Sequence, residues 1–169
     1  MIRAIAAIDN KRGMATDTGI PWKLPSDGER FTTLTQDGII LMGYGTYKEL
    51  TKPLHDKPNY VVTRDADEKL RDGFVPVVDT DKFFVTHDDI IWDIGGPGLL
   101  AATIDHIDEL YLTQIDSDFN CTKFFPEYEN DFTRQSVSDE KTENGISFRF
   151  EIWHRKTDSP ALQIVPPLV

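Results

Sequence analysis

The sequence predicts an α/β protein with a mostly parallel, twisted central sheet of about eight strands, helices on both faces and an antiparallel C-terminal hairpin. The first six strand candidates are short, nearly continuous apolar runs, which is typical of strands that are buried on both faces. The segments between them are long enough for crossover helices. The last two candidates are joined by a polar segment that contains Asn-Gly, a pair favoured in hairpin turns.

The strand candidates follow one another along the chain. The six apolar runs are IRAIAAI (2–8), GIILMG (38–43), NYVVT (59–63), FVPVV (74–78), DIIWDIGG (89–96) and ELYLTQI (109–115). The hairpin candidates are FTRQSVS (132–138) and ISFRFEIWH (146–154). No repeat divides the chain, so we expect one catalytic domain over 1–155 and a peripheral, partly disordered tail over 156–169 that holds several prolines.

Composition excludes several classes of function. The chain has 169 residues, 39% of them hydrophobic, a net charge of −11 and a pI near 4.7, so it repels nucleic acids and anionic membranes. It has no apolar run long enough to span a bilayer, and its N-terminal run is too short for a signal peptide. One cysteine and four dispersed histidines match no metal-site spacing. We expect a cytoplasmic monomer without a bound metal, a nucleic-acid partner or a membrane partner.

Two glycine-containing turns follow predicted strands. Ile94–Gly98 (IGGPG) lies between a strand and a helical segment, and Met42–Leu50 (MGYGTYKEL) has the same arrangement. Each could be an ordinary tight turn, because neither has the G-x-G-x-x-G spacing. Two such turns at the carboxyl ends of neighbouring strands are also what a dinucleotide pyrophosphate needs.

Asp27, in the stretch GIPWKLPSDGERF, has two interpretations. Ser26 or Asp27 could cap the following helix through its side chain. Alternatively, Phe31 lies one helical turn after Asp27, so burial of the aromatic ring would carry the carboxylate into an apolar pocket. A desolvated carboxylate has a raised pKa and suits proton transfer near neutral pH.

Together these motifs resemble the dihydrofolate reductase family. The matching blocks are IAAID, IPWKLPSD followed by Phe31, LMGYGTY, PLHDKPNYVVTR, IGGPGLL, ELYLTQID, FFPEY and FRFEIW, in the family's order and over about residues 1–155. The resemblance implies hydride transfer from NADPH to C6 of 7,8-dihydrofolate with protonation at N5. Two alternatives remain: another pteridine or pyrimidine reductase on the same fold, and a catalytically weak pterin-binding protein.

The resemblance also assigns roles to individual residues. Asp27 would bind the pterin, Trp22 would hold a water beside it and Thr113 would orient the carboxylate, which makes these three the catalytic set. The substrate-binding residues would be Ile5, Phe31, Leu50, Leu54, Lys57 and Ile94. The cofactor-binding residues would be Ala6, Ala7, Ile20, Gly43, Tyr44, Gly45, Thr46, Thr63, Arg64, Gly95, Gly96, Pro97, Gly98 and Leu99. Residues 9–24 would form a mobile lid over the nicotinamide.

Several positions depart from the family's pattern. Tyr44 replaces the arginine that usually pairs with the extra phosphate of NADPH, which leaves Arg64 as the expected partner. Lys57 replaces an arginine that clamps the glutamate carboxylate of folate. Gly28 replaces a large apolar residue and opens one wall of the pocket. Three further departures are Pro97 in the glycine triplet, Leu100 in place of a tyrosine, and Thr122 in place of an aspartate that steadies the lid.

Overall fold

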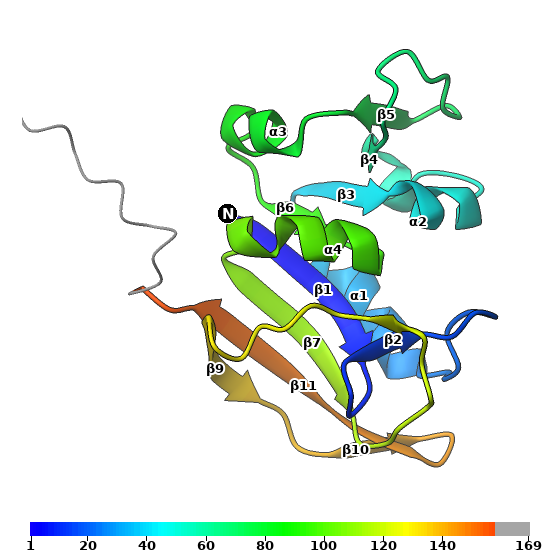
Figure 1. Cartoon of the computed structure of the whole chain (residues 1–169). Helices are drawn as coiled ribbons and strands as arrows, with labels where there is room; N and C mark the ends of the chain where they lie inside the picture. The colour runs from blue at the N-terminus through cyan, green and yellow to red at the C-terminus, as the bar shows by residue number, and fades with distance from the viewer. Residues whose placement is uncertain (158–169) are drawn as a thin grey trace, which may run out of the picture.

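The computed structural model describes residues 1–157, so the tail predicted from 156 lies almost wholly outside the described residues. The chain forms a nine-stranded sheet with the order β10-β11-β7-β1-β6-β3-β4-β5, and β9 also pairs with β11 (Figure 1). Pairing among β7, β1, β6, β3, β4 and β5 is parallel throughout. The predicted fold class is confirmed.

All six predicted apolar strands are present in this parallel part. They are β1 (Ile2–Ile8), β3 (Ile39–Gly43), β4 (Asn59–Val62), β5 (Phe74–Val77), β6 (Ile91–Asp93) and β7 (Glu109–Ile115). Strand β6 is much shorter than the predicted run 89–96, because the chain turns away from the sheet at Ile94 and the two glycines that follow.

The C-terminal strands are antiparallel, as predicted, but the hairpin has a different first strand. Strand β11 (Ile146–Arg155) pairs with β10 (Lys141–Glu143) across a turn in which Asn144 and Gly145 have φ values of 52° and 74°. Positive φ at both positions is the type I′ geometry that Asn-Gly favours. Strand β9 (Phe132–Val137), expected to be the hairpin partner, pairs with the later part of β11.

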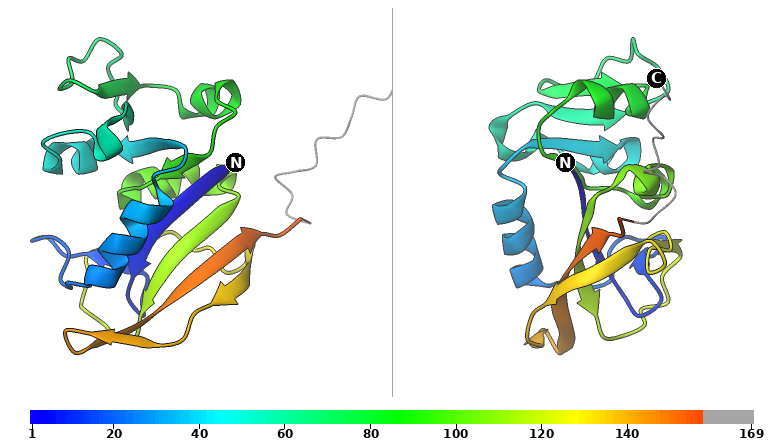
Figure 2. Two further views of the ribbon diagram at one scale, coloured as in Figure 1. Left: turned by 180° about the vertical axis from the view of Figure 1, so that it is seen from behind. Right: turned by 90° about the vertical axis from the view of Figure 1, so that its left-hand side faces the viewer.

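Helices cover both faces of the sheet (Figure 2). Helices α1 (Pro25–Leu34) and α2 (Tyr44–Glu49) pack on the face that carries Ile40 and Met42. Helices α3 (Thr80–Thr86) and α4 (Pro97–Thr103) pack on the opposite face, where Leu41 points. Short 3-10 turns, η1 (Leu54–Asp56) and η2 (Ile104–His106), follow α2 and α4. Alternation along β3 therefore divides the core into two layers.

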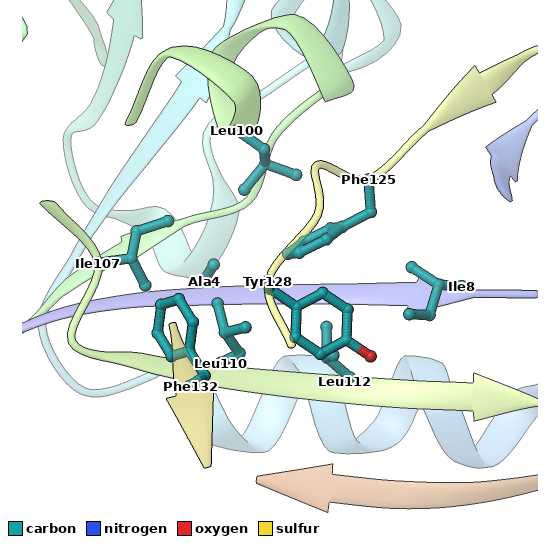
Figure 3. Packing of buried hydrophobic residues seen from close by; sticks show 9 residues of the cluster. All are labelled: Ala4, Ile8, Leu100, Ile107, Leu110, Leu112, Phe125, Tyr128 and Phe132. Carbon is teal, nitrogen blue, oxygen red and sulfur yellow. The ribbon is translucent and has the colours of Figure 1, made fainter. Parts of the chain in front are cut away.

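The core beneath α4 joins the sheet to the chain segment before β9 (Figure 3). Leu100 of α4 is fully buried and packs with Phe125 and Phe132 against Ala4 and Leu110 of the sheet. Leu100, which departs from the resemblance, is thus a core residue of this chain. Its burial fixes α4 against β1 and β7 and so holds the preceding glycine turn in place.

A second, two-stranded sheet was not predicted. Strand β2 (Gly13–Ala15) pairs antiparallel with β8 (Lys123–Phe124), close to the carboxyl end of β1 (Figure 1). Both strands have too few residues to produce a periodic pattern in the sequence. Within residues 1–157, no helix is long and apolar enough to cross a bilayer, and no cluster of His, Cys, Asp or Glu side chains could hold a metal ion.

Candidate active site

Helix α1 places Asp27 against β7. The helix begins at Pro25, with Leu24 as its N-cap, and no side chain caps it, so the capping interpretation of Ser26 or Asp27 is wrong. Pro25 suits this first position because its ring fixes φ and its missing N–H is not needed there. Asp27 instead accepts a hydrogen bond at Oδ1 from Thr113 Oγ1, at 2.5 Å. The pocket interpretation is the one that the geometry supports.

The surroundings of Asp27 favour its protonated form. Burial raises the pKa of the carboxyl group above its ordinary value, and the nearby charge of Glu143 adds to this effect. The Thr113 hydrogen bond and the positive charge of Arg30 act in the opposite direction and lower the pKa, but burial is larger. A half-buried carboxylate with a raised pKa, held by one neutral donor, is suited to proton transfer near neutral pH.

Arg30 belongs to this site although the sequence gave no reason to select it. It lies one turn after Asp27 on α1, and its guanidinium carbon is 4.5 Å from the ring centre of Phe150 and 5.8 Å from that of Tyr111. Its Nη1 atom is buried without a hydrogen-bond partner within residues 1–157. Burial lowers the pKa of Arg30, and Asp27 raises it. Stacking on the two aromatic faces stabilises this cation in its half-buried position.

The hairpin turn anchors the start of α1. Glu143 accepts hydrogen bonds from the backbone N–H of Ser26, at 3.0 Å, and from its hydroxyl. Asn144 donates from Nδ2 to the carbonyl of Lys23 at 2.8 Å. These contacts join residues more than 110 positions apart, so the position of Asp27 depends on strand β10 and the hairpin turn as well as on its own helix.

Five predicted substrate residues lie in one apolar cluster. Ile5 is buried, and four partly buried side chains pack against the same core: Phe31, Leu50, Leu54 and Ile94. They come from β1, α1, the α2 C-cap, η1 and the end of β6, which no local pattern could bring together. Gly28 faces open space, since a Cβ atom placed on it would meet nothing within 4 Å. A larger side chain at position 28 would therefore have space next to it.

Lys57, the sixth predicted substrate residue, is tied to the loop after α1. Its ammonium group donates to the carbonyl of Gln36 at 2.8 Å and to the carbonyl of Gly38. An ammonium group has three N–H donors, so one is left for a ligand. The structure thus places a cation beside the C-terminal end of α1 and shows that most of its bonding capacity is used by the protein.

The predicted lid, residues 9–24, is anchored by hydrogen bonds at its first residue. Buried Asp9 accepts hydrogen bonds from the backbone N–H groups of Lys11, Gly13 and Phe119, at 2.7 to 3.1 Å. The rings of Trp22 and Phe119 meet edge to face at 5.3 Å. The predicted cofactor residue Ile20 lies near the tip and is 68% exposed.

Thr122 provides a further link between the lid and the rest of the chain. Its Oγ1 donates to Asp17 at 2.8 Å, and its backbone N–H donates to the carbonyl of Ala15 at 2.9 Å. The resemblance placed an aspartate at position 122. In this chain a hydroxyl stands at that position, and its partner on the predicted lid is the carboxylate of Asp17.

The two glycine turns meet, as predicted. Strands β3 and β6 are neighbours, and Gly43 N donates to the carbonyl of Gly95 at 2.7 Å. A Cβ on Gly43 would lie 3.5 Å from Gly95 O and Gly96 N, whereas a Cβ on Gly45 or Gly98 would meet nothing. The backbone is thus packed between the turns and open on the outer side.

Asp93 supports this turn and is a second residue that sequence analysis missed. It is fully buried at the end of β6, where Oδ1 accepts from Gly95 N at 2.9 Å and Oδ2 accepts from Thr103 Oγ1 at 2.6 Å. Burial raises its pKa to about 6, against the two hydrogen bonds, which lower it. The signal that the sequence offered for Asp93 was an acidic residue within the apolar run of a predicted strand.

The remaining predicted cofactor residues lie along the carboxyl end of the sheet. Ala6 and Ala7 are at the end of β1, Tyr44 and Thr46 are in the first turn of α2, Pro97 and Leu99 are in α4, and Thr63 and Arg64 follow β4. Leu99 also packs into the core on the α3 side. Tyr44, Thr63 and Arg64 line one pocket together with Glu68, which was not predicted. The predicted set therefore spans β1, β6, β3 and β4, which are consecutive in the sheet.

An open parallel sheet with glycine turns at adjacent strand ends has the layout of a dinucleotide-dependent α/β enzyme. The sequence profile of dihydrofolate reductase matches residues 1–155. Dihydrofolate reductase of Bacillus subtilis (strain 168) is 29% identical over 95% of this chain and 98% of that protein. Dihydrofolate reductase type 3 of Salmonella typhimurium is 33% identical over 76% of this chain and 80% of that protein.

Structure comparison agrees on the fold. Dihydrofolate reductase from Enterococcus faecalis, solved in complex with NADP(H) and RAB-propyl, has a TM-score of 0.79, 22% identity and coverage of 92% of this chain and 96% of that one. The chain belongs to the dihydrofolate reductase family. It is accordingly an oxidoreductase, and the recognition made on the sequence blocks is confirmed.

Proposed function

We propose that this chain reduces 7,8-dihydrofolate to 5,6,7,8-tetrahydrofolate with NADPH, and that Asp27 holds the pterin and supports protonation at N5. Membership of the family assigns the reaction and the cofactor. The observation that carries the role of Asp27 is its position, half-buried against β7, with its pKa raised by burial.

Asp27 would act through charge and position. A carboxylate facing the amidine-like edge of a pterin can form two parallel, charge-assisted hydrogen bonds, which fix the orientation of the ring. Thr113 occupies Oδ1 from one side and so limits the rotation of the carboxylate. In its ionised form Asp27 favours the protonated substrate through its charge, and its raised pKa brings its own proton transfer closer to neutral pH. Trp22, whose ring packs against Phe119, would hold the water next to Asp27 and the pterin.

The residues present fit a dinucleotide. The turn around Gly95 and Gly96 has its backbone open on one side at Gly98, and Gly45 is equally open at the start of α2. The residues that would hold NADPH are the cofactor set given above, from the two alanines of β1 to Arg64. When bound, NADPH supplies the hydride. The protein's part is to orient the two rings, to exclude water with residues 9–24 and to manage the proton at Asp27.

The apolar cluster would bind the rest of the substrate. Phe31, Leu50 and Leu54 would pack against the benzoyl group, and the free donor of Lys57 would meet the glutamate carboxylate. We propose one catalytic domain over 1–155, acting as a cytoplasmic monomer without a nucleic-acid partner. The net charge of −11 and the single, free cysteine support this part of the proposal.

The test is NADPH oxidation with dihydrofolate, followed by absorbance. Asp27→Asn keeps the size of the side chain but removes its charge, so kcat/KM at neutral pH should fall by about 10²-fold or more. Activity should recover in part at low pH, where solvent protonates the substrate. The control is Glu29→Gln, which makes the same charge change at an exposed position of α1 and should stay within about twofold of the parent.

Three outcomes would contradict the proposal. Near-parental activity of Asp27→Asn at neutral pH would remove the role given to this carboxylate. Binding of dihydrofolate and NADPH by the parent protein without turnover would favour the weak pterin-binding protein. Turnover of another pteridine or pyrimidine, but not of dihydrofolate, would favour the related reductase.

A further inference from the structure

A pocket of about 570 Å³ opens beyond the carboxyl ends of β4 and β5. This volume lies within the range of small-ligand sites. Its described lining residues are Tyr44, Val62, Thr63, Arg64, Glu68 and Val78. Strand β4 is three positions from β1 in the sheet, about 14 Å away at ordinary strand spacing. The pocket is therefore at the far end of the predicted cofactor residues, where the adenosine half of a dinucleotide would lie.

Glu68 accepts a hydrogen bond from a hydroxyl group that lines the pocket. Its Oε2 is the acceptor and Thr63 Oγ1 the donor, at 2.5 Å. Tyr44 lines the same pocket. The Thr63 hydrogen bond is the largest cause that lowers the pKa of Glu68, and the Tyr44 hydroxyl adds to it, so the group is a carboxylate at neutral pH. The interaction with Glu68 is in turn the largest cause that raises the pKa of Tyr44.

The charge balance of the pocket is not that of a phosphate site. Among the described lining residues, Arg64 carries the positive charge and Glu68 carries the negative charge. Arg64 is exposed, and the loop that follows it also contains Asp65 and Asp67. A phosphate dianion entering the pocket would meet one cation, one carboxylate and a Thr63 hydroxyl already engaged by that carboxylate.

We propose that Glu68 is a specificity-determining residue that weakens recognition of a ribose 2′-phosphate and accepts a ribose 2′-hydroxyl, so that NADH competes with NADPH in this chain. The inference rests on the proposed function for the identity of the dinucleotide. An acidic side chain on the 2′-hydroxyl is the general solution for NAD, whereas arginine suits the 2′-phosphate. Here both lie in one pocket, Arg64 favouring the phosphate and Glu68 opposing it.

Calorimetric titration of the full chain with two nucleotides tests this assignment without turnover. Adenosine 2′,5′-bisphosphate and adenosine 5′-monophosphate differ only in the 2′-phosphate. Glu68→Gln removes the charge but keeps an oxygen for Thr63, so it should tighten the bisphosphate by about tenfold, as expected for loss of one like charge at short range. Binding of the monophosphate should change by less than about twofold.

Asp67→Asn is the matched control, because it makes the same charge change at an exposed position of the same loop outside the pocket lining. At physiological salt, screening should limit its effect on both nucleotides to less than about twofold. Equal gains from Glu68→Gln and Asp67→Asn would mean a long-range charge effect and would overturn the proposal. So would an equal change for both nucleotides, or no change, in Glu68→Gln.

Steady-state rates separate this proposal from the function on which it rests. With dihydrofolate, Glu68→Gln should raise the ratio of kcat/KM for NADPH to that for NADH about tenfold, with kcat at saturating cofactor unchanged. Dihydrofolate reduction with an unaltered ratio would refute Glu68 and leave the proposed function standing. A shifted nucleotide preference in a protein that does not reduce dihydrofolate would refute the proposed function and leave Glu68 standing.

Discussion

Asp93 should make the stability of this protein depend on pH in a way that one substitution removes. The carboxylate is fully buried between Gly95 N and Thr103 Oγ1, and its pKa is raised by burial to about 6. Thr103 Oγ1 also lies 2.9 Å from the carbonyl of Leu99. When Asp93 is protonated it can donate to Thr103, which then donates to Leu99. When Asp93 is ionised, Thr103 must donate to it instead.

The size of the effect follows from the pKa. The ordinary value of 3.8 applies to the unfolded chain and about 6 to the folded protein. A raised carboxyl pKa stabilises the fold most at pH values below both pKa values, and this contribution is lost as the pH rises from one to the other. At about 1.4 kcal/mol per pKa unit, the difference amounts to about 3 kcal/mol by neutral pH. The ionised carboxylate destabilises the fold by this amount.

Asp93→Asn should abolish this pH-dependent contribution to the free energy of unfolding. Its amide oxygen can accept from Gly95, and its amide nitrogen can donate to Thr103, as the protonated acid does. The second N–H has no obvious partner there, so a constant loss of about 1–3 kcal/mol accompanies the change. The measurement is urea unfolding followed by tryptophan fluorescence, from about pH 4 to about pH 7.5. The free energy of unfolding of the parent minus that of Asp93→Asn should fall by about 2.5 kcal/mol across this range, because the unfolded chain is already partly ionised at this position at pH 4.

Comparing the free energies of unfolding of the parent and Asp93→Asn at each pH cancels the contributions of the other titrating groups, which both proteins share. Asp105→Asn makes the same chemical change at an exposed position just after α4 and is the matched control. A difference between the parent and Asp93→Asn that stayed constant from acid to neutral pH would refute the reasoning, because Asp93 would then have the same pKa folded and unfolded.

Three further predictions concern binding. Gly28→Leu has free space for its side chain, so it should lower the dissociation constants of dihydrofolate and of tail-less diaminopyrimidine inhibitors about tenfold, through roughly 1–2 kcal/mol of apolar contact. Unchanged dissociation constants would count against an open pocket wall at this position. Lys57→Arg has enough N–H donors to keep both carbonyl contacts and still make two hydrogen bonds to the glutamate carboxylate, so dihydrofolate should bind up to about fivefold more tightly while the affinity of tail-less inhibitors stays the same. Equal tightening of both ligands would mean that position 57 does not meet the carboxylate. Thr122→Val removes the side-chain bond to Asp17, so NADPH should dissociate about three- to tenfold faster in stopped flow; an unchanged rate would show that this bond does not hold the lid.

Much of the fold was legible in the sequence because buried parallel strands are continuous apolar runs. Strands such as β1 and β7 were predicted within a residue or two. The hairpin turn was found because Asn-Gly favours positive φ at both positions. Its first strand was assigned wrongly, since β10 has three residues and is polar and mostly exposed, so neither hydrophobicity nor periodicity marks it.

The candidate site was predictable where resemblance named a residue and was missed where it did not. Arg30 and Glu68 read as ordinary surface charges in the sequence. What distinguishes them is what surrounds them: two aromatic faces and Asp27 for Arg30, and the Thr63 hydroxyl for Glu68. Asp93 was overlooked inside a strand that was judged by its apolar neighbours.

The sequence by itself determined the order of the strands along the chain and the position of the glycine turns, and it selected Asp27 as the candidate acidic residue, because these depend on short-range preferences and on recognisable blocks. Only the tertiary structure decided that Asp27 is bound by Thr113 rather than capping its helix, that Lys57 is held by two carbonyls and that Glu68 accepts from Thr63. Charge, burial and hydrogen bonding at a site depend on which distant segments meet there. No local pattern carries that information until the sheet has assembled.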